Sequence, residues 1–150
     1  MNSEDTAVGI SERDVILCVI DFSEASKEAL RTAINIAGST GSALKVLYPY
    51  RLNQPRNVSD VSQWKKNLEA EANSNFSLMT RTLLAGSNVP CEFKAEVGFV
   101  DDRIEAFAHK NNVGLMIIGS ELAHKSDGAF FDILNNLSSP LLIVPSTKRI

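Results

Sequence analysis

The feature that most constrains the fold is the apolar run VILCVI at positions 15–20, which an acidic residue and a helix start follow at once. The run has the length of a strand and is rich in β-branched residues, as expected for a strand buried on both faces of a parallel sheet. Asp21 stands where this strand would leave the sheet. Ser23 stands at a helix N-cap position, because its hydroxyl can accept a hydrogen bond from a free amide of the turn that begins at Glu24. Together these residues predict the opening of a doubly wound α/β fold.

Strand and helix patterns then alternate along the chain. Further strands are predicted at 43–48, where Pro49 closes the strand, and at 91–97, 115–118 and 141–144. Helical spacing of apolar residues predicts helices at 25–37, ended by Gly38 and Gly41, and at 61–83, 100–108 and 130–137, with a polar loop at 120–127.

This alternation predicts a five-stranded parallel sheet with helices on both faces and the strand order 3-2-1-4-5. The first and fourth strands are then neighbours. Small-molecule sites in such sheets lie beyond the carboxyl ends of the strands, at the point where the winding reverses. We therefore expect Asp21 and Gly119 to flank a common crevice.

Composition limits the classes of function. A chain of 150 residues fits one domain, here 14–150, after a lead-in at 1–13. The net charge of -3 and the lack of a basic run argue against binding to nucleic acid or to an anionic membrane. No apolar run approaches the roughly 18 residues that a membrane span needs, so a cytoplasmic location is expected. Cys18 and Cys91 lack the spacing of a metal or redox pair and are expected to be reduced core residues.

From about Asp14 to Pro145 the chain resembles a universal stress protein (UspA-like) domain. The resemblance is carried by VIDFSEAS and ALRTAINIA at the start, LMIIGS at the fourth strand and SSPLLIVP at the end. It implies an adenine nucleotide alpha hydrolase-like fold with a five-stranded parallel sheet, and a protein that commonly forms dimers. Some members of this family bind ATP and others do not.

In the members that bind, the resemblance places the adenine near Asp21 and near the end of the second strand, here Tyr48 and Pro49. The phosphates lie over a loop after the fourth strand that contains Gly, two residues, Gly, nine residues and then Gly with Ser or Thr. Gly119 and Ser120 stand at the start of this loop, and Ser23, two residues after Asp21, is a further candidate residue of the crevice.

The glycine pattern of that loop is degenerate. Leu122 stands at the second glycine position and Asp132 at the third. Counted back from Pro140, Gly128 lies near the final Gly-Ser of the family, but the loop is then about four residues shorter. Glycines let backbone amides approach phosphate oxygens that bulky side chains hold away. We therefore expect Leu122 to hinder phosphate binding.

The charged residues of the same loop support two hypotheses about phosphate binding. Asp127 is the expected N-cap of the last helix, so its carboxylate would occupy the helix terminus that a phosphate needs. His124 and Lys125 could offset the repulsion, which leaves weak anion binding as an alternative. Asp21 could contact a ligand or could close the corner beside Ser23, and the structural role is favoured.

The predicted function is that of a non-catalytic, dimeric stress-response or regulatory module without a cofactor, acting on an unidentified protein partner. His124, Glu121 and Asp127 lack a placed nucleophile, so no catalytic cluster is predicted. The alternative is a protein that binds ATP or AMP and hydrolyses ATP slowly at most.

The last strand is the expected dimer interface. Leu141, Leu142, Ile143 and Val144 carry no charge, and in the order 3-2-1-4-5 they form an edge with unpaired backbone groups. Resemblance to the family agrees, since its members often associate through this strand about a two-fold axis. The alternative is that the tail 146–150 covers the edge.

Overall fold

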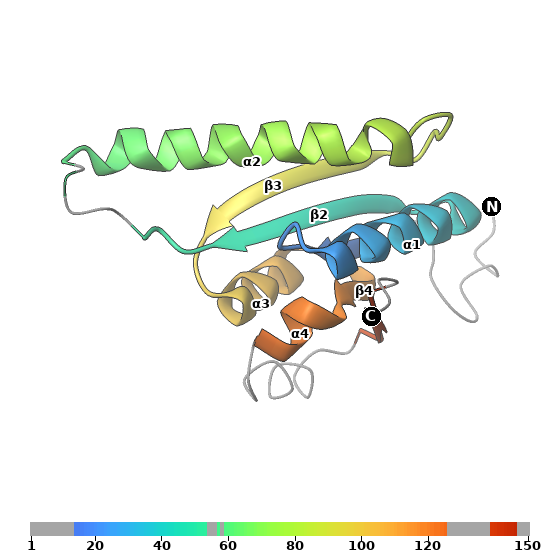
Figure 1. Ribbon diagram of the computed structural model, residues 1–150. Helices are drawn as coiled ribbons and strands as arrows, with labels where there is room; N and C mark the ends of the chain where they lie inside the picture. The colour runs from blue at the N-terminus through green and yellow to red at the C-terminus, as the bar shows by residue number, and fades with distance from the viewer. Residues whose placement is uncertain (1–13, 54–56, 58, 126–138, 147–150) are drawn as a thin grey trace.

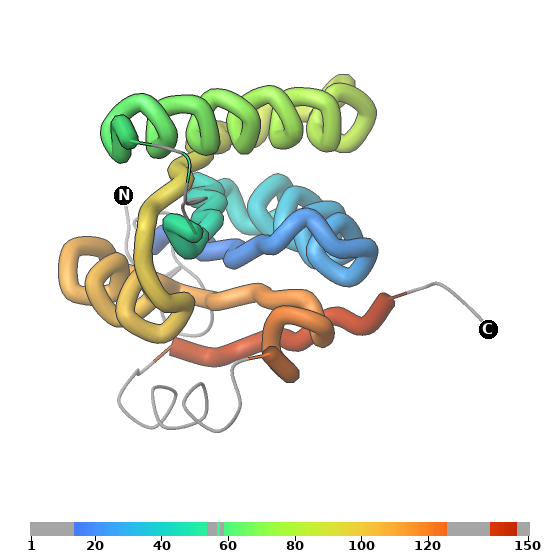
Figure 2. Tube along the Cα trace, turned by 60° about the vertical axis from the view of Figure 1, so that its left-hand side comes forward, coloured from blue at the N-terminus to red at the C-terminus, as the bar shows by residue number. Residues whose placement is uncertain are grey.

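Five parallel strands form one sheet in the order β3-β2-β1-β4-β5, as the sequence predicts. The computed structural model describes residues 14–53, 57, 59–125 and 139–146. Figure 2 shows β5 at one edge of the sheet, at the opposite side of the molecule from α2. The strands are β1 (Val15–Val19), β2 (Ala43–Tyr50), β3 (Cys91–Val97), β4 (Val113–Gly119) and β5 (Leu141–Val144).

Helices cover both faces of the sheet (Figure 1). One face packs against the first two helices and the other against the third and fourth, which is the arrangement that right-handed crossovers produce in this strand order. The helices are α1 (Glu24–Thr40), α2 (Val61–Leu83), α3 (Val100–Lys110) and α4 (Ser120–Lys125). Within the described ranges, no helix is both long and apolar enough to cross a membrane.

The central strand β1 supplies both cores, as its unbroken apolar sequence predicts. Ile16 and Cys18 lie in the core beneath α1 and α2, and Leu17 and Val19 lie in the core beneath α3 and α4. Successive side chains of a strand point to opposite faces, so a strand covered on both sides must be apolar throughout. Cys18 is buried and unbonded, and burial raises the pKa of its thiol.

Two predicted element ends near α1 and β2 are corrected. Gly38 does not end α1, which continues to Thr40 and ends at Gly41. Gly41 has a φ of 72°, a left-handed conformation that favours glycine. Pro49 does not close β2 either, because the strand runs on to Tyr50. The ladder with β1 ends at Leu47, so a residue at position 49 needs no N–H group on that side.

The predicted polar loop at 120–127 is wrong in its described part, where residues 120–125 form α4. Leu122 and Ala123 are buried and pack in the same core as Ile104 of α3. This contact with the sheet stabilises a helix that is too short to show a periodic apolar pattern in the sequence. Asp127 and the predicted helix at 130–137 lie outside the described residues.

A close backbone contact fixes the first turn of α1 against the end of β4. A Cβ atom built on Gly119 would lie 2.7 Å from the carbonyl carbon of Ala25 and 2.8 Å from the nitrogen of Ser26. Both atoms belong to the backbone, so neither can move aside as a flexible side chain would. Glycine at position 119 therefore allows α1 to sit directly on β4.

We predict that Gly119→Ala lowers the free energy of unfolding by about 1–3 kcal/mol, because the added methyl group overpacks this contact. Gly38→Ala is the matched control. Its added Cβ would meet only Val89 at an ordinary 3.5 Å, and alanine in a helix is favoured over glycine by about 0.5–1 kcal/mol. Urea unfolding of both variants measures the difference. Equal stability of Gly119→Ala and the wild type would contradict the proposed contact.

Candidate functional site

The winding of the sheet reverses between β1 and β4, which lie side by side at its centre. After β1 the chain proceeds to β2, and after β4 it proceeds to β5 on the other side. The segments that leave these two strands therefore diverge and open a space above the carboxyl ends. Asp21 follows β1 at this point, and Ser120 follows β4.

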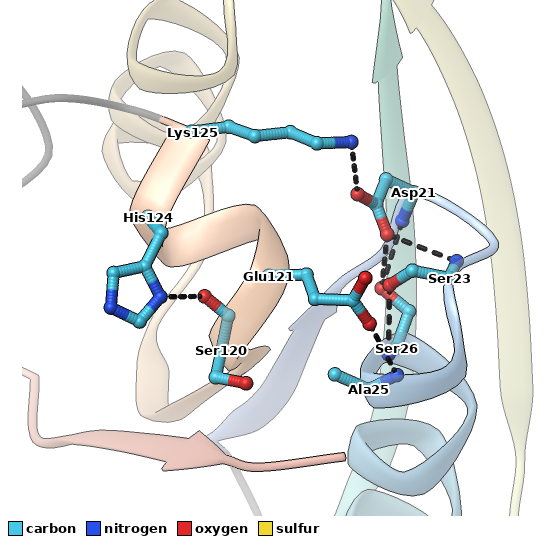
Figure 3. A network of polar contacts seen from close by, with 8 residues as sticks. All are labelled: Asp21, Ser23, Ala25, Ser26, Ser120, Glu121, His124 and Lys125. Atoms are coloured by element: carbon cyan, nitrogen blue, oxygen red, sulfur yellow. Dashed lines mark hydrogen bonds and ion pairs between the residues drawn. The ribbon is translucent and has the colours of Figure 1, made fainter. Parts of the chain in front are cut away.

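Asp21 closes the turn between β1 and α1 (Figure 3). Its Oδ1 atom accepts hydrogen bonds from the backbone nitrogen of Ser23 at 3.1 Å and from the hydroxyl of Ser26 at 2.8 Å. The backbone nitrogen of Asp21 donates to the same Ser26 hydroxyl at 3.0 Å. The Ser26 backbone nitrogen donates to the Ser23 hydroxyl at 3.2 Å, which confirms Ser23 as the N-cap of α1.

An ion pair joins this turn to α4. The Nζ atom of Lys125 lies 3.1 Å from Oδ2 of Asp21. Burial acts to raise the pKa of Asp21, but the hydrogen bonds from Ser23, Ser26 and Lys125 outweigh this desolvation and hold the pKa below its usual value. Asp21 is therefore a carboxylate whose charge is already balanced within the chain.

A second carboxylate, that of Glu121 on α4, contacts the start of α1. Oε1 of Glu121 accepts a hydrogen bond from the backbone nitrogen of Ala25 at 3.2 Å. The first amides of a helix have no partner within the helix, and their partial positive charge favours an anion. A carboxylate and a phosphate compete for such a position. Glu121 thus holds the place that an external anion would take at this helix end.

The side chain of His124 contacts its own helix, not the turn that holds Asp21. Its Nδ1 atom lies 2.7 Å from the carbonyl oxygen of Ser120 on the same helix, so Nδ1 carries the proton that is donated. In Figure 3 the ring points away from Asp21. The structure therefore does not bring His124 together with the carboxylates of this network.

A crevice of about 450 Å³ opens beside Asp21, between the end of β2 and α2. Phe22 forms part of its wall and has a φ of 65°, a left-handed conformation that is uncommon for residues other than glycine. Its ring meets the ring of Tyr48 edge-on, with the centroids 4.9 Å apart. The rings of Tyr48 and Tyr50 stack with their centroids 5.8 Å apart. The lining of the crevice also includes polar residues from the segment after β2 and from α2 and α4, namely Arg51, Asn53, Glu71, Asn75 and Lys125.

The two tyrosines of the crevice have raised pKa values. Burial raises the pKa of Tyr48, and the nearby charges of Asp21 and Glu71 raise it further. Burial also raises the pKa of Tyr50, whose hydroxyl donates to Oε2 of Glu69 at 2.8 Å. Both phenols are therefore neutral hydrogen-bond donors at neutral pH.

The sequence profile of the universal stress protein family matches residues 12–145. The chain belongs to this family. Its fold is similar to that of UspA from Lactobacillus plantarum, with 19% identity, a TM-score of 0.67, and coverage of 90% of this chain and 99% of that chain. The comparison with curated proteins gave no match.

Two further solved structures of universal stress proteins contain nucleotides. One is in complex with cAMP, with 16% identity and a TM-score of 0.66 over 91% of this chain and 100% of that chain. The other, from Archaeoglobus fulgidus, is in complex with dAMP, with 16% identity and a TM-score of 0.62 over 90% of this chain and 99% of that chain. At such identities the likeness concerns the fold.

The residues that family resemblance assigns to a nucleotide site are only partly brought together. Asp21, Tyr48 and Pro49 line the crevice. The remaining described candidates have other positions: Ser23 caps α1, Gly119 lies beneath its first turn, and Ser120 begins α4. Gly128 lies outside the described residues. Leu122, at the second glycine position of the family pattern, is buried and lines the crevice.

Sequence reasoning missed several residues of the crevice. Tyr50 was missed because the strand was expected to end before Pro49, although its two-residue spacing from Tyr48 puts both side chains on one face of a longer strand. Glu71 and Asn75 come from α2, and no pattern in that helix indicates which polar positions face β2. The bond from Ala25 to Glu121 joins residues 96 apart, and no local signal predicts it.

The lowered pKa of Asp21 predicts a specific dependence of stability on pH. A carboxylate whose pKa is lowered in the folded state stabilises the protein above its unfolded pKa of about 3.9, and this contribution is lost as the pH falls through the folded value. We expect Asp21→Asn to lower the free energy of unfolding by about 1–3 kcal/mol at pH 7, because charged hydrogen bonds are lost. The difference from the wild type should shrink as the pH falls below about 4.

Urea unfolding of both proteins between neutral pH and pH 3 measures this difference. Ser26→Ala is an informative companion, since it removes one donor to Asp21 and leaves the carboxylate in place. At pH 7 the free energy of unfolding of Ser26→Ala should therefore lie closer to that of Asp21→Asn than the wild-type value does. A difference between the wild type and Asp21→Asn that stays constant across this pH range would show that the ionised form of Asp21 is not the stabilising species.

Proposed function

We propose that this universal stress protein is a non-catalytic, dimeric stress-response or regulatory module whose nucleotide site is degenerate and which acts on a protein partner. The observation that carries the proposal is the Glu121 carboxylate on the first turn of α1. A triphosphate placed there would have to displace this side chain from the amide of Ala25 and would meet its negative charge.

The charge of Lys125 supports the same conclusion. Lys125 is a basic residue on the lining of the crevice, but it pairs with Asp21. Arg51, another basic residue of the lining, lies with its guanidinium carbon 4.0 Å from the centre of the Phe99 ring. A phosphate would therefore compete with Asp21 for Lys125, whereas Arg51 keeps its charge in the contact with Phe99. Leu122, which also lines the crevice, has a bulky side chain where the family pattern has a glycine.

The competing function is binding of ATP or AMP with slow hydrolysis at most. It is favoured by the aromatic crevice beside Asp21 and by the relatives whose structures contain cAMP or dAMP. The two functions differ in what they require of Glu121. Retained nucleotide binding needs this carboxylate to leave α1, whereas the proposed function keeps it in place.

Equilibrium binding of a labelled ATP analogue tests the proposal. We expect the wild type to show no micromolar affinity, which would correspond to about -8 kcal/mol. Glu121→Gln should improve binding by about tenfold, because it removes one like charge and keeps an oxygen that can accept from Ala25. Glu105→Gln, an exposed position on α3, is the control for loss of one charge. Micromolar binding by the wild type would overturn the proposed function in favour of the alternative.

The dimer is proposed to form through β5. Among the described strands only β4 pairs with β5, and the other edge of β5 forms no strand pair within the described residues, which is what association through this edge requires. Leu142 is 37% exposed and Ile143 39% exposed, whereas Leu141 and Val144 pack against the cores. Apolar side chains on an open edge favour association, and a two-fold axis would close the assembly as a dimer.

We predict that Ile143→Lys is a folded monomer. The exposure of Ile143 means that a lysine can be accommodated, and near a two-fold axis its charge would face its own copy. Leu78→Lys is the matched control, because Leu78 is 60% exposed on α2, and Figure 2 shows α2 at the opposite side of the molecule from β5. Light scattering should give a dimeric mass for the wild type and the control. A dimeric mass for Ile143→Lys would exclude this interface.

A further inference from the structure

The sheet has a second edge at β3, at the opposite end of the strand order from β5 (Figure 2). β3 pairs with β2, and no other strand pairs with it within the described residues. The backbone nitrogen of Gly98, which follows β3, donates to the carbonyl oxygen of Tyr50 in β2 at 2.9 Å. Because successive residues of a strand direct their backbone groups to opposite sides, those of Phe93, Ala95 and Val97 are directed away from β2. An extended chain could pair with this row of groups.

An open groove of about 510 Å³ follows this edge. Its lining includes the consecutive residues 93–97 of β3, whose side chains alternate between the two faces of the sheet. A cavity lined by both sets of side chains lies along the edge of the strand and not over one face. Lys65, Glu69 and Asn73 of α2 line the groove from one face of the sheet, and Arg103 of α3 lines it from the other. The groove is therefore placed where an added strand would lie.

The charge of the groove is opposite in sign to that of the whole chain. Three basic and two acidic residues line it, which gives a net charge of +1, whereas the chain has -3. Lys65 pairs with Glu69 at 3.5 Å, and Lys94 pairs with Glu96 at 3.4 Å. No hydrogen bond or ion pair of the Arg103 side chain is found within the described part of the chain, and its Nε atom is buried. The unbalanced charge of the groove is therefore the guanidinium of Arg103.

The contact between Arg103 and Gly98 fixes where this side chain lies. A Cβ atom built on Gly98 would lie 2.9 Å from Nε of Arg103 and 3.1 Å from its Cδ. Gly98 also has a φ of 145°, a conformation that residues with a side chain rarely adopt. The Arg103 side chain therefore passes over the backbone at the carboxyl end of β3. A guanidinium in such a position can bind a carboxylate through two parallel hydrogen bonds.

We propose that the outer edge of β3 binds an extended acidic segment of a protein partner, which joins the sheet as a sixth strand and places a carboxylate against Arg103. This inference rests on the proposed function, because it gives a surface and a chemistry to the protein partner of that function. The backbone groups of β3 supply the affinity, as in other cases of strand addition. Arg103 supplies the preference for an acidic side chain.

Fluorescence anisotropy with a labelled peptide of seven residues, the length of β3, tests the inference. The probe alternates valine with glutamate, and a second probe has glutamine at each glutamate position. We expect the wild type to bind the glutamate peptide at least about tenfold more tightly, since charge-assisted hydrogen bonds are about twice as strong as neutral ones. Arg103→Gln should abolish this preference. Arg31→Gln, at an exposed position on α1, is the matched control and should retain it.

N-methylated forms of the glutamate peptide distinguish strand addition from attraction between charges. Alternate amides of an added strand face β3, so methylation of one alternate set should abolish binding and methylation of the other set should not. Ala95→Pro is the corresponding change in the protein, because it removes an N–H group directed away from β2 and keeps the ladder with β2. It should weaken binding about tenfold or more. Far-UV circular dichroism shows whether this variant is folded. If it is not, the methylated peptides decide the question on the wild type.

The outcomes separate the inference from the proposed function. Absence of peptide binding, or equal affinity for the glutamate and glutamine peptides, would overturn the inference and leave the proposed function standing. Binding that both methylated peptides retain would exclude strand addition. A mass above that of a dimer in light scattering, reduced to a dimer by Ala95→Pro, would assign the edge to a second copy of this chain and not to a partner. Micromolar binding of the ATP analogue would overturn the proposed function and would not alter the peptide result.

Discussion

The contact between the first turn of α1 and the end of β4 is the constraint on which the rest of the site depends. Gly119 has no side chain, and the backbone of Ala25 and Ser26 occupies the space that a Cβ atom would need. This contact brings the residues after β4 directly beneath the start of α1. Glu121 then reaches the amide of Ala25, and Lys125 reaches Asp21. Two polar links across the switch point thus follow from one close backbone approach.

The links change what the carboxyl end of the sheet can bind. Open α/β sheets place ligands at this position because helix amides and loop groups are free there. In this universal stress protein, the Glu121 carboxylate of α4 accepts a hydrogen bond from one of those amides. Lys125 of α4 forms an ion pair with Asp21. The part of the crevice that stays open is aromatic and is lined by β2 and α2. The aromatic part of the crevice therefore differs in chemical character from the polar network of Asp21, Glu121 and Lys125 beside it.

The hydrogen bonds around Asp21 show how a half-buried carboxylate becomes stable. Desolvation alone would raise its pKa and favour the neutral acid, but donors from Ser23, Ser26 and Lys125 reverse the direction of the shift. Ser26 is fully buried and both donates to the Asp21 carboxylate and accepts from the Asp21 backbone. The corner between β1 and α1 is thus held by side chains within six consecutive residues, 21–26. Such local bonds explain why the sequence alone already indicated this corner.

The sequence by itself determined the strands, the helices and the cap of α1, because these depend on local patterns, and the rule of right-handed crossovers extended them to the sheet order and the covered faces. An unbroken apolar run predicts a buried central strand, and Ser23 is close enough in sequence to cap the helix that follows. Only the tertiary structure decided that residues 120–125 are helical, that β2 continues past Pro49, and that Glu121 lies on α1. Each of these depends on a contact between segments far apart in the chain. Leu122 is helical because it packs on the core beneath α3, and Pro49 is tolerated because β1 has already ended beside it. Such contacts are set by where the strands end in space, which no periodicity within a single segment records.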